Sequence, residues 1–217
     1  ENFYDENMSL IRIKLNPAIS PAANAQKYYK DYQKAKNAEH ILTEQIEKGR
    51  SELEYIDSVL DTVSRAESER ELAQIREELT EQGYLRKQKG KQRPQAALPP
   101  LEFTSSDGFK ILVGRNNTQN DKLTLKIANK NDMWLHTKDI HGSHTVVFAE
   151  GREISDTAIL EAAQLAAYYS KARESSQVPV DYTLVRYVSK PSGARPGMVI
   201  YVNNKTVYVT PKANISK

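Results

Sequence analysis

The residues best suited to chemistry gather in one stretch of the sequence, from Asn131 to His144. This stretch holds the only tryptophan of the chain, three of its four histidines and two aspartates. Asp132, Trp134 and His136 alternate, so they share one face if the segment is a strand. A glycine inside the stretch permits a turn that can bring His144 back beside them. Such a group is either a functional site or a buried polar network.

Three kinds of chemistry fit these side chains. Histidine and carboxylate are common metal ligands, but the spacing matches no metal motif and the ligands are few, which disfavours a metal site. His136 with Asp132 resembles an acid–base pair, yet no nucleophile accompanies it. We therefore favour a hydrogen-bonded pair that holds a loop in shape for contact with RNA or protein. We expect no catalytic residue, no metal and no cofactor.

The composition excludes several classes of protein. The chain has 217 residues and no cysteine, which excludes disulfide scaffolds, thiolate zinc sites and cysteine nucleophiles. This absence also favours a cytoplasmic protein. No apolar run approaches the roughly 18 residues of a membrane span, so we expect no membrane insertion. The chain begins at Glu1 without a signal-like run, and we expect it to be a fragment of a longer protein.

The net charge of +3 hides a strong segregation of acids and bases. Between Glu39 and Glu81 there are 13 acidic and 5 basic residues, whereas six basic residues and no acidic one follow Asp181. Such asymmetry predicts that the C-terminal part meets a polyanion and that the acidic part is a solvated spacer. The alternative is that the basic tail only serves solubility.

The first half of the chain reads as a helical arm. Residues 10–15 alternate apolar and basic side chains, as in a half-buried strand. A heptad repeat of apolar residues from Tyr28 to Val63 then predicts a long helix of the coiled-coil type. The apolar seam of this helix is covered either by a second helix of the same chain, as in a helical hairpin, or by another chain. Residues 68–71 form a capping box for a second helix that stops at Gly83.

The second half reads as a small sheet domain behind a basic and proline-rich linker at 87–100. We place the arm at 1–97 and the domain at 98–217. Strands are predicted at 109–113, 123–127, 133–136, 145–148 and 182–188, a helix at 157–171, and a hairpin that joins 198–202 to 206–209 through two asparagines. The fold class is α+β: a long helical coiled-coil hairpin arm followed by a small mixed, mostly antiparallel sheet domain with one packed helix.

Several motifs together resemble the NFACT family. The stretches that carry the resemblance are LNPAISPAANAQKYY (15–29), EELTEQGYL (77–85), SDG (106–108), VGRNN (113–117), NDKLT (120–124), residues 132–144, KPSGARPG (190–197) and KTVYVTP (205–211). The resemblance covers nearly the whole chain. It implies the C-terminal half of a family member, in which the middle coiled coil precedes the RNA-binding NFACT-R domain at 98–217.

The resemblance also implies a function and partners. Family members act in ribosome quality control: they bind the obstructed large ribosomal subunit, with its rRNA, and tRNA, and they support template-free C-terminal tailing of stalled chains, with alanine in bacteria. The N-terminal half of the same protein is then a further partner, and the expected location is cytoplasmic. The alternative is an anchorless surface adhesin, a virulence factor that binds fibronectin or fibrinogen.

Ten side chains are predicted to take part in RNA binding, because they are basic, aromatic or within the 131–144 stretch. They are Arg115, Lys122, Asp132, Trp134, His136, Lys138, His144, Lys190, Arg195 and Lys205. Arginine suits bidentate contact with phosphate, and Trp134 either stacks on an unpaired base or anchors the sheet. Whether His136 and His144 touch RNA or only hold the loop is left open.

Overall fold

The computed structural model describes residues 2, 5–87 and 97–213. Packing divides the chain into two compact units, Glu1–Glu52 and Leu53–Lys217. Most of the predicted linker lies outside the described residues, and the domain boundary predicted beside it stays a prediction. None of the described helices combines the length and apolarity that crossing a membrane requires.

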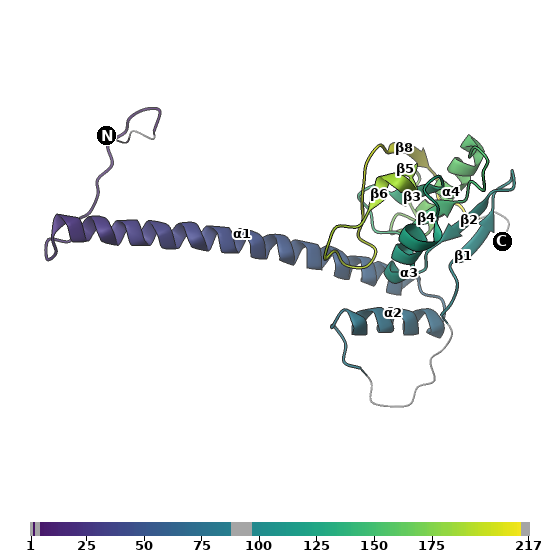
Figure 1. Ribbon diagram of the computed structural model, residues 1–217, viewed down its shortest axis with the longest axis horizontal. Coiled ribbons are helices and arrows are strands. Elements are labelled where there is room, and N and C mark those ends of the chain that lie inside the picture. The colour runs from purple at the N-terminus through teal and green to yellow at the C-terminus, as the bar shows by residue number, and fades with distance from the viewer. Residues whose placement is uncertain (1, 3–4, 88–96, 214–217) are drawn as a thin grey trace. The chain divides into compact units, whose positions relative to one another are not determined.

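The heptad repeat forms helix α1 (Pro21–Arg65), as predicted (Figure 1). At its start the Asn24 side chain is buried and donates to three backbone carbonyls, those of Asn16, Ile19 and Ser20. The strand predicted at 10–15 is wrong: this segment has no regular structure, and Leu10 is 84% exposed. An alternating pattern makes a strand only where a partner strand and a core cover it, and the described residues supply neither there.

Helix α2 (Glu69–Glu81) begins at the predicted capping box. The Ser68 hydroxyl accepts from the Glu71 N–H at 3.3 Å, and the Glu71 carboxylate accepts from the Ser68 N–H at 3.2 Å. Within the larger unit, Ile75 of this helix packs against Tyr55 and Val59 of α1. The heptad positions 53, 56 and 60 stay exposed, so α2 covers a different face of α1 from the heptad seam.

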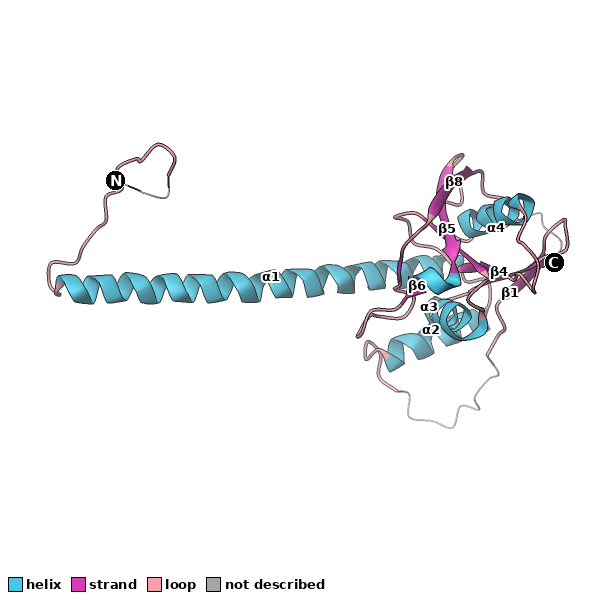
Figure 2. Cartoon of the chain, turned by 45° about the horizontal axis from the view of Figure 1, so that its top comes forward, coloured by secondary structure: helices cyan, strands magenta, loops and turns pink. Residues whose placement is uncertain are grey.

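The larger unit contains a six-stranded antiparallel sheet in the order β1-β2-β4-β3-β5-β8. Figure 2 shows its strands in magenta. Its strands are β1 (Leu101–Thr104), β2 (Lys110–Val113), β3 (Met133–Thr137), β4 (Thr145–Val147), β5 (Val178–Leu184) and β8 (Lys205–Val209). Helix α4 (Asp156–Tyr168) is capped by Ser155 and lays its alanines on one face of this sheet. The small alanine side chains allow a close approach, and the predicted α+β class is confirmed.

The other face of the sheet carries a second apolar cluster around Trp134. It is covered by the short helix α3 (Asn117–Lys122), the π-helix η1 (Leu123–Ile127) and a separate two-stranded ribbon of β6 (Val188–Ser189) and β7 (Ile200–Tyr201). The 3₁₀ turn η2 (Val185–Tyr187) joins β5 to β6.

Two sequence predictions for this face are wrong. Residues 123–127 are helical rather than a strand, because Asn116 caps α3 and the backbone then continues into η1, with Leu123 buried beneath it. The hairpin of 198–202 with 206–209 does not form: β7 pairs with β6, and β8 pairs with β5. Asn203 does adopt the positive φ expected of it, +56°, but the strands on its two sides enter different sheets. The strand predicted at 182–188 also divides, since β5 ends at Leu184.

Candidate functional site

The 131–144 stretch brings three rings together on the second face of the sheet. Trp134 stacks on His136 with ring centroids 5.8 Å apart, and His144 meets both rings edge-on, at 5.2 Å from Trp134 and 5.4 Å from His136. Trp134 is fully buried and His144 is 1% exposed. The rings therefore form the centre of a core rather than an open surface. Trp134 Nε1 is buried without a hydrogen-bond partner in the described part of the chain.

Asp132 stabilises a turn rather than a histidine. Its carboxylate accepts from the Asn129 N–H at 2.7 Å and from the Ala149 N–H at 2.9 Å, and the residue is 2% exposed. His144 instead shares a hydrogen bond of 2.8 Å with the Thr124 hydroxyl through Nδ1. The acid–base pair of Asp132 with His136 that the sequence left open is thus not formed.

The two histidines of this cluster are held neutral near pH 7. Burial lowers the pKa of His136 to about 4. Burial, together with the nearby His136, also holds the pKa of His144 well below its usual range. A neutral, buried imidazole offers no charge to a phosphate, so in this structure the cluster is suited to supporting the sheet.

Arg115 ties the sheet unit to the start of α2. Its Nη1 donates to Glu71 at 2.5 Å, and its Nε donates to the Pro99 carbonyl at 2.9 Å. Burial raises the pKa of the Glu71 carboxyl, but the Glu67 N–H and the Arg115 guanidinium outweigh it and leave that pKa lowered. The charge of Arg115 is therefore compensated inside the molecule.

Lys190 and Asp121 hold the 190–197 loop against α3. The Lys190 ammonium pairs with one Asp121 oxygen and donates to the Arg195 carbonyl, and the other Asp121 oxygen accepts from the Gly197 N–H at 3.0 Å. Gly197 has a φ of +80°, and a Cβ there would lie 2.7 Å from the Asn117 side-chain oxygen. The KPSGARPG motif thus fits closely onto α3.

Arg195 fastens the same loop to the helices. Its Nη1 donates to Gln82 at 3.0 Å, and its guanidinium carbon lies 5.4 Å from the Tyr84 ring centroid and 5.7 Å from that of Tyr55. Both tyrosines come from the helical part of the larger unit, so this one side chain joins α1, the end of α2 and the loop.

A buried carboxylate completes these connections. Glu78 is 3% exposed and accepts from the Tyr55 hydroxyl, the Thr118 N–H and the Thr118 hydroxyl, each at 3.0 Å. Burial, followed by the Glu78 charge, raises the pKa of Tyr55. Asn117 donates to the Ser58 hydroxyl at 2.9 Å. We call this set the polar junction: Tyr55, Glu71, Glu78, Arg115, Asn117, Thr118, Asp121, Lys190 and Arg195.

Sequence reasoning missed the amides of this junction. The run Asn116 to Asn120 is polar but uncharged and stands between two apolar segments. Three of its members, Asn116, Asn117 and Asn120, are at most 5% exposed. A run of amides between two apolar segments is typical of a capped turn, and this pattern could have indicated that the amides are buried and hydrogen-bonded.

Three of the ten predicted RNA-binding residues have exposed side chains: Lys122, Lys138 and Lys205. They lie at the end of α3, after β3 and at the start of β8. No ion pair holds them within the described part of the chain. They can therefore reach a ligand without breaking an internal contact.

A cavity of about 250 Å³ lies between the last turn of α1, α2 and α4. Its lining includes Arg65 and Arg115, but Arg65 pairs with Asp61 at 2.8 Å and Arg115 pairs with Glu71. A third lining arginine, Arg173, lies 4.0 Å over the Tyr168 ring, and no carboxylate in the described part of the chain pairs with it. Among the described residues, no group of three or more histidines and carboxylates could hold a metal ion.

Two family profiles match the chain in succession. The profile described as NFACT N-terminal and middle domains matches residues 1–97, and the one described as NFACT protein RNA binding domain matches residues 100–203. Among curated proteins, the Rqc2 homolog RqcH of Bacillus subtilis (strain 168) is 49% identical over 216 residues, which are 98% of this chain and 37% of that protein. The Rqc2 homolog RqcH of Streptococcus suis (strain 05ZYH33) is 45% identical over 202 residues, 93% of this chain and 36% of that protein.

A solved structure is also similar. It is the C-terminal part of the fibronectin/fibrinogen-binding protein from Streptococcus suis, with a TM-score of 0.83 and 43% identity over 90% of this chain and 78% of that one. The chain spans little more than a third of the length of the curated relatives that it matches.

Proposed function

The chain belongs to the NFACT family, and we propose that it is the C-terminal half of a ribosome-associated quality-control factor. In this role it binds the obstructed large ribosomal subunit and tRNA, and it supports template-free alanine tailing of stalled nascent chains together with the N-terminal half of the same protein. The match of residues 100–203 to an RNA-binding domain is the observation that carries the proposal. The RqcH relatives support the wider role in quality control.

The exposed lysines give the proposal a physical basis. Lys122, Lys138 and Lys205 can each neutralise a phosphate, and binding that releases counterions weakens steeply as the salt concentration rises. Lys190 and Arg195 are less suited to this task, because their charges are already engaged within the polar junction. Asp132, Trp134, His136 and His144 contribute by keeping the sheet in shape.

Co-sedimentation with large ribosomal subunits tests this function. The full-length protein that contains this chain should sediment with obstructed large subunits at low salt and lose them as salt increases. Replacing Lys122, Lys138 and Lys205 by glutamate should reduce the bound fraction at least tenfold and flatten the salt dependence. A variant with Lys171, Arg173 and Lys212 changed to glutamate has the same net charge and serves as the matched control. Equal binding by both variants would refute the role of the three lysines.

A second candidate function is binding of fibronectin or fibrinogen. It is favoured by one observation, the similarity to the solved fibronectin/fibrinogen-binding protein of Streptococcus suis. Surface-immobilised fibronectin should then capture the chain with saturable binding that excess soluble fibronectin displaces. Binding that is lost at 0.5 M salt in parallel for fibronectin and for an unrelated acidic protein would indicate nonspecific charge attraction instead.

A further inference from the structure

The ribbon of β6 and β7 presents apolar side chains to solvent. Its register pairs Val188 with Tyr201 and Ser189 with Ile200. Val188 and Tyr201 face inward, where the Tyr201 ring lies 4.8 Å from Trp134 and its hydroxyl donates to Asp181 at 2.9 Å. Ile200 is consequently directed outward and is 58% exposed.

Two further apolar side chains extend this outward face. The Val202 N–H donates to the Tyr187 carbonyl at 3.2 Å, so the two residues are neighbours across the ribbon. Val202 is 59% exposed and Tyr187 is 38% exposed. Three exposed apolar residues on one part of the domain form a patch, and such patches are often interaction sites.

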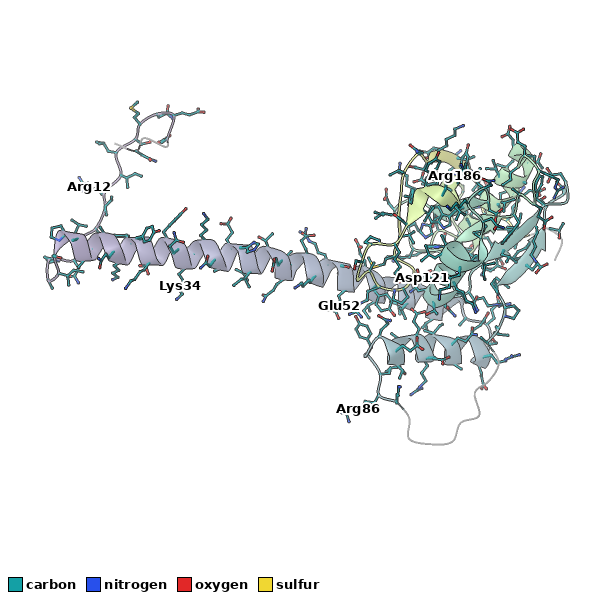
Figure 3. All side chains as sticks on the ribbon, viewed as in Figure 1. Arg12, Lys34, Glu52, Arg86, Asp121 and Arg186 are labelled. Carbon is teal, nitrogen blue, oxygen red and sulfur yellow. The ribbon has the colours of Figure 1, made fainter. Side chains whose placement is uncertain are left out.

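Basic groups border the patch. The Arg186 N–H and Nε both donate to the Lys130 carbonyl, at 3.3 and 3.2 Å, and its Nη2 donates to the Asn131 side chain. These bonds hold the guanidinium against residues 130 and 131, and Figure 3 shows Arg186 apart from Asp121. Arg186 and Lys130 are both exposed.

The two segments that meet here contain no acid. Residues 122–131 carry three lysines, and residues 182–213 carry five basic side chains, with no aspartate or glutamate in either segment. Asp132, which follows the first segment, and Asp181, which precedes the second, are each 2% exposed. The face therefore combines positive charge with apolar and aromatic surface. These two segments bring it no exposed carboxylate, and the exposed Asp139, from outside them, acts on Tyr201 by adding to the effect of burial in raising the pKa of its hydroxyl.

We infer that this ribbon surface, formed by Lys130, Arg186, Tyr187, Ile200 and Val202, binds unpaired RNA nucleotides. Basic side chains alone suffice for a duplex, whose base faces are hidden, whereas an exposed aromatic and aliphatic platform suits the open faces of unpaired bases. Tyr187 stacks on a base, Ile200 and Val202 support its neighbour, and Arg186 and Lys130 contact phosphates. This inference rests on the proposed function, because it names the kind of RNA that the domain takes.

The test compares two RNA probes on the complete chain. A fluorescein-labelled 12-nucleotide oligouridylate is the unpaired probe, and a 12-base-pair duplex of mixed sequence is the paired one. Tyr187→Ala should weaken binding of the oligouridylate about tenfold, as expected for loss of one stacked base, and leave duplex binding within twofold. Tyr187→Phe keeps the ring and should restore the affinity. Tyr208→Ala, which removes a tyrosine that is 67% exposed on β8, is the matched control and should change neither affinity.

A second variant checks the aliphatic part of the surface. Ile200→Ser combined with Val202→Ser removes exposed apolar groups, should preserve the circular dichroism spectrum and should also weaken oligouridylate binding selectively. Two results overturn the inference. One is an unchanged oligouridylate affinity in both Tyr187→Ala and the double serine variant, and the other is a wild-type chain that binds only the duplex. In either case the surface would suit a protein partner instead. Those results leave the proposed function intact as long as the protein still sediments with large subunits. If the wild-type full-length protein does not sediment with obstructed large subunits at low salt, the proposed function itself is refuted.

Discussion

Arg195 uses its charge inside the molecule, over two tyrosine rings and against Gln82. Replacing it by methionine keeps much of the stem but removes the hydrogen bond and the cation–π contacts. We expect the free energy of unfolding to fall by about 1–2 kcal/mol, measured by urea denaturation. Lys205→Met, at an exposed position, is the control and should stay within about 0.5 kcal/mol of wild type. If Arg195 instead contacts RNA, Arg195→Met will weaken RNA binding and leave the free energy of unfolding unchanged.

His136 gives the molecule a defined dependence of stability on pH. Its pKa is about 4 in the fold and about 6.5 in the unfolded chain, so between these values the unfolded chain binds more protons. Stability is therefore complete above about pH 6.5 and falls as the pH drops toward 4. At pH 5 the loss is on the order of 2 kcal/mol relative to pH 7, and His144, whose pKa is lowered in the same direction, adds to it.

Urea denaturation at pH 7 and pH 5 measures this loss. The groups that act on the two imidazoles include His141 and Asp181 for His136 and Lys190 for His144, so the buffer should keep the ionic strength constant. Replacing both histidines by glutamine should flatten the difference between the two pH values. His40→Gln, at an exposed histidine of α1, should retain it. A difference that survives the double replacement would assign the effect to other groups.

At the scale of elements, the 190–197 loop depends on a close approach to α3. Gly197 and Gly193 both have a positive φ, +80° and +76°, but only a Cβ at Gly197 would meet another atom, 2.7 Å away on Asn117. Gly193→Ala should cost about 1 kcal/mol from backbone strain alone. Gly197→Ala should cost roughly 1–3 kcal/mol more because of the added crowding. Equal losses in a urea titration would show that α3 does not constrain the loop.

The sequence predicted some of the helices and strands correctly and others not. Local signals were sufficient for α1, α2 and α4, because a heptad repeat, a capping box and an alanine-rich amphipathic run each act within a few turns of helix. They failed at 123–127, where the alternation of Leu123, Thr124 and Leu125 suited a strand but the cap at Asn116 had already started a helix. They failed again at β7 and β8, since pairing across a sheet is decided by distant strands.

The candidate site was predictable in its composition but not in its exposure. The alternation in the 131–144 stretch identified Trp134 and His136, whose rings do stack on each other, whereas Asp132 bonds to backbone N–H groups elsewhere. The burial of Trp134 and the pairing of Lys190 with Asp121 depend on residues far away in the sequence. A basic side chain in an acid-free segment carries no local sign of whether its charge meets solvent or a partner from α3.

At the scale of the whole molecule, the polar junction makes the end of α1, α2 and the sheet one compact unit, Leu53–Lys217. Tyr55, Val59 and Ile75 form an apolar cluster beside it, with Met198 of the loop packed against them. The end of α1 and helix α2 therefore belong to the same compact unit as the RNA-binding domain.

This unit yields a prediction about fragments. A 98–217 fragment lacks Tyr55, Glu71 and Glu78, so it leaves Thr118, Arg115 and Arg195 without their partners. We expect it to be less stable than a 53–217 fragment by at least 3 kcal/mol, since each lost buried partner costs about 1–3 kcal/mol. Urea denaturation of both fragments measures the difference, and the 53–217 fragment should unfold in one transition seen alike by tryptophan fluorescence and by circular dichroism. Two separate transitions, or equal stability of the two fragments, would mean that the junction does not couple the helices to the sheet.

Glu78→Ala in the longer fragment should reproduce part of the loss without removing any helix, because the Tyr55 hydroxyl and the Thr118 N–H then lose the same acceptor.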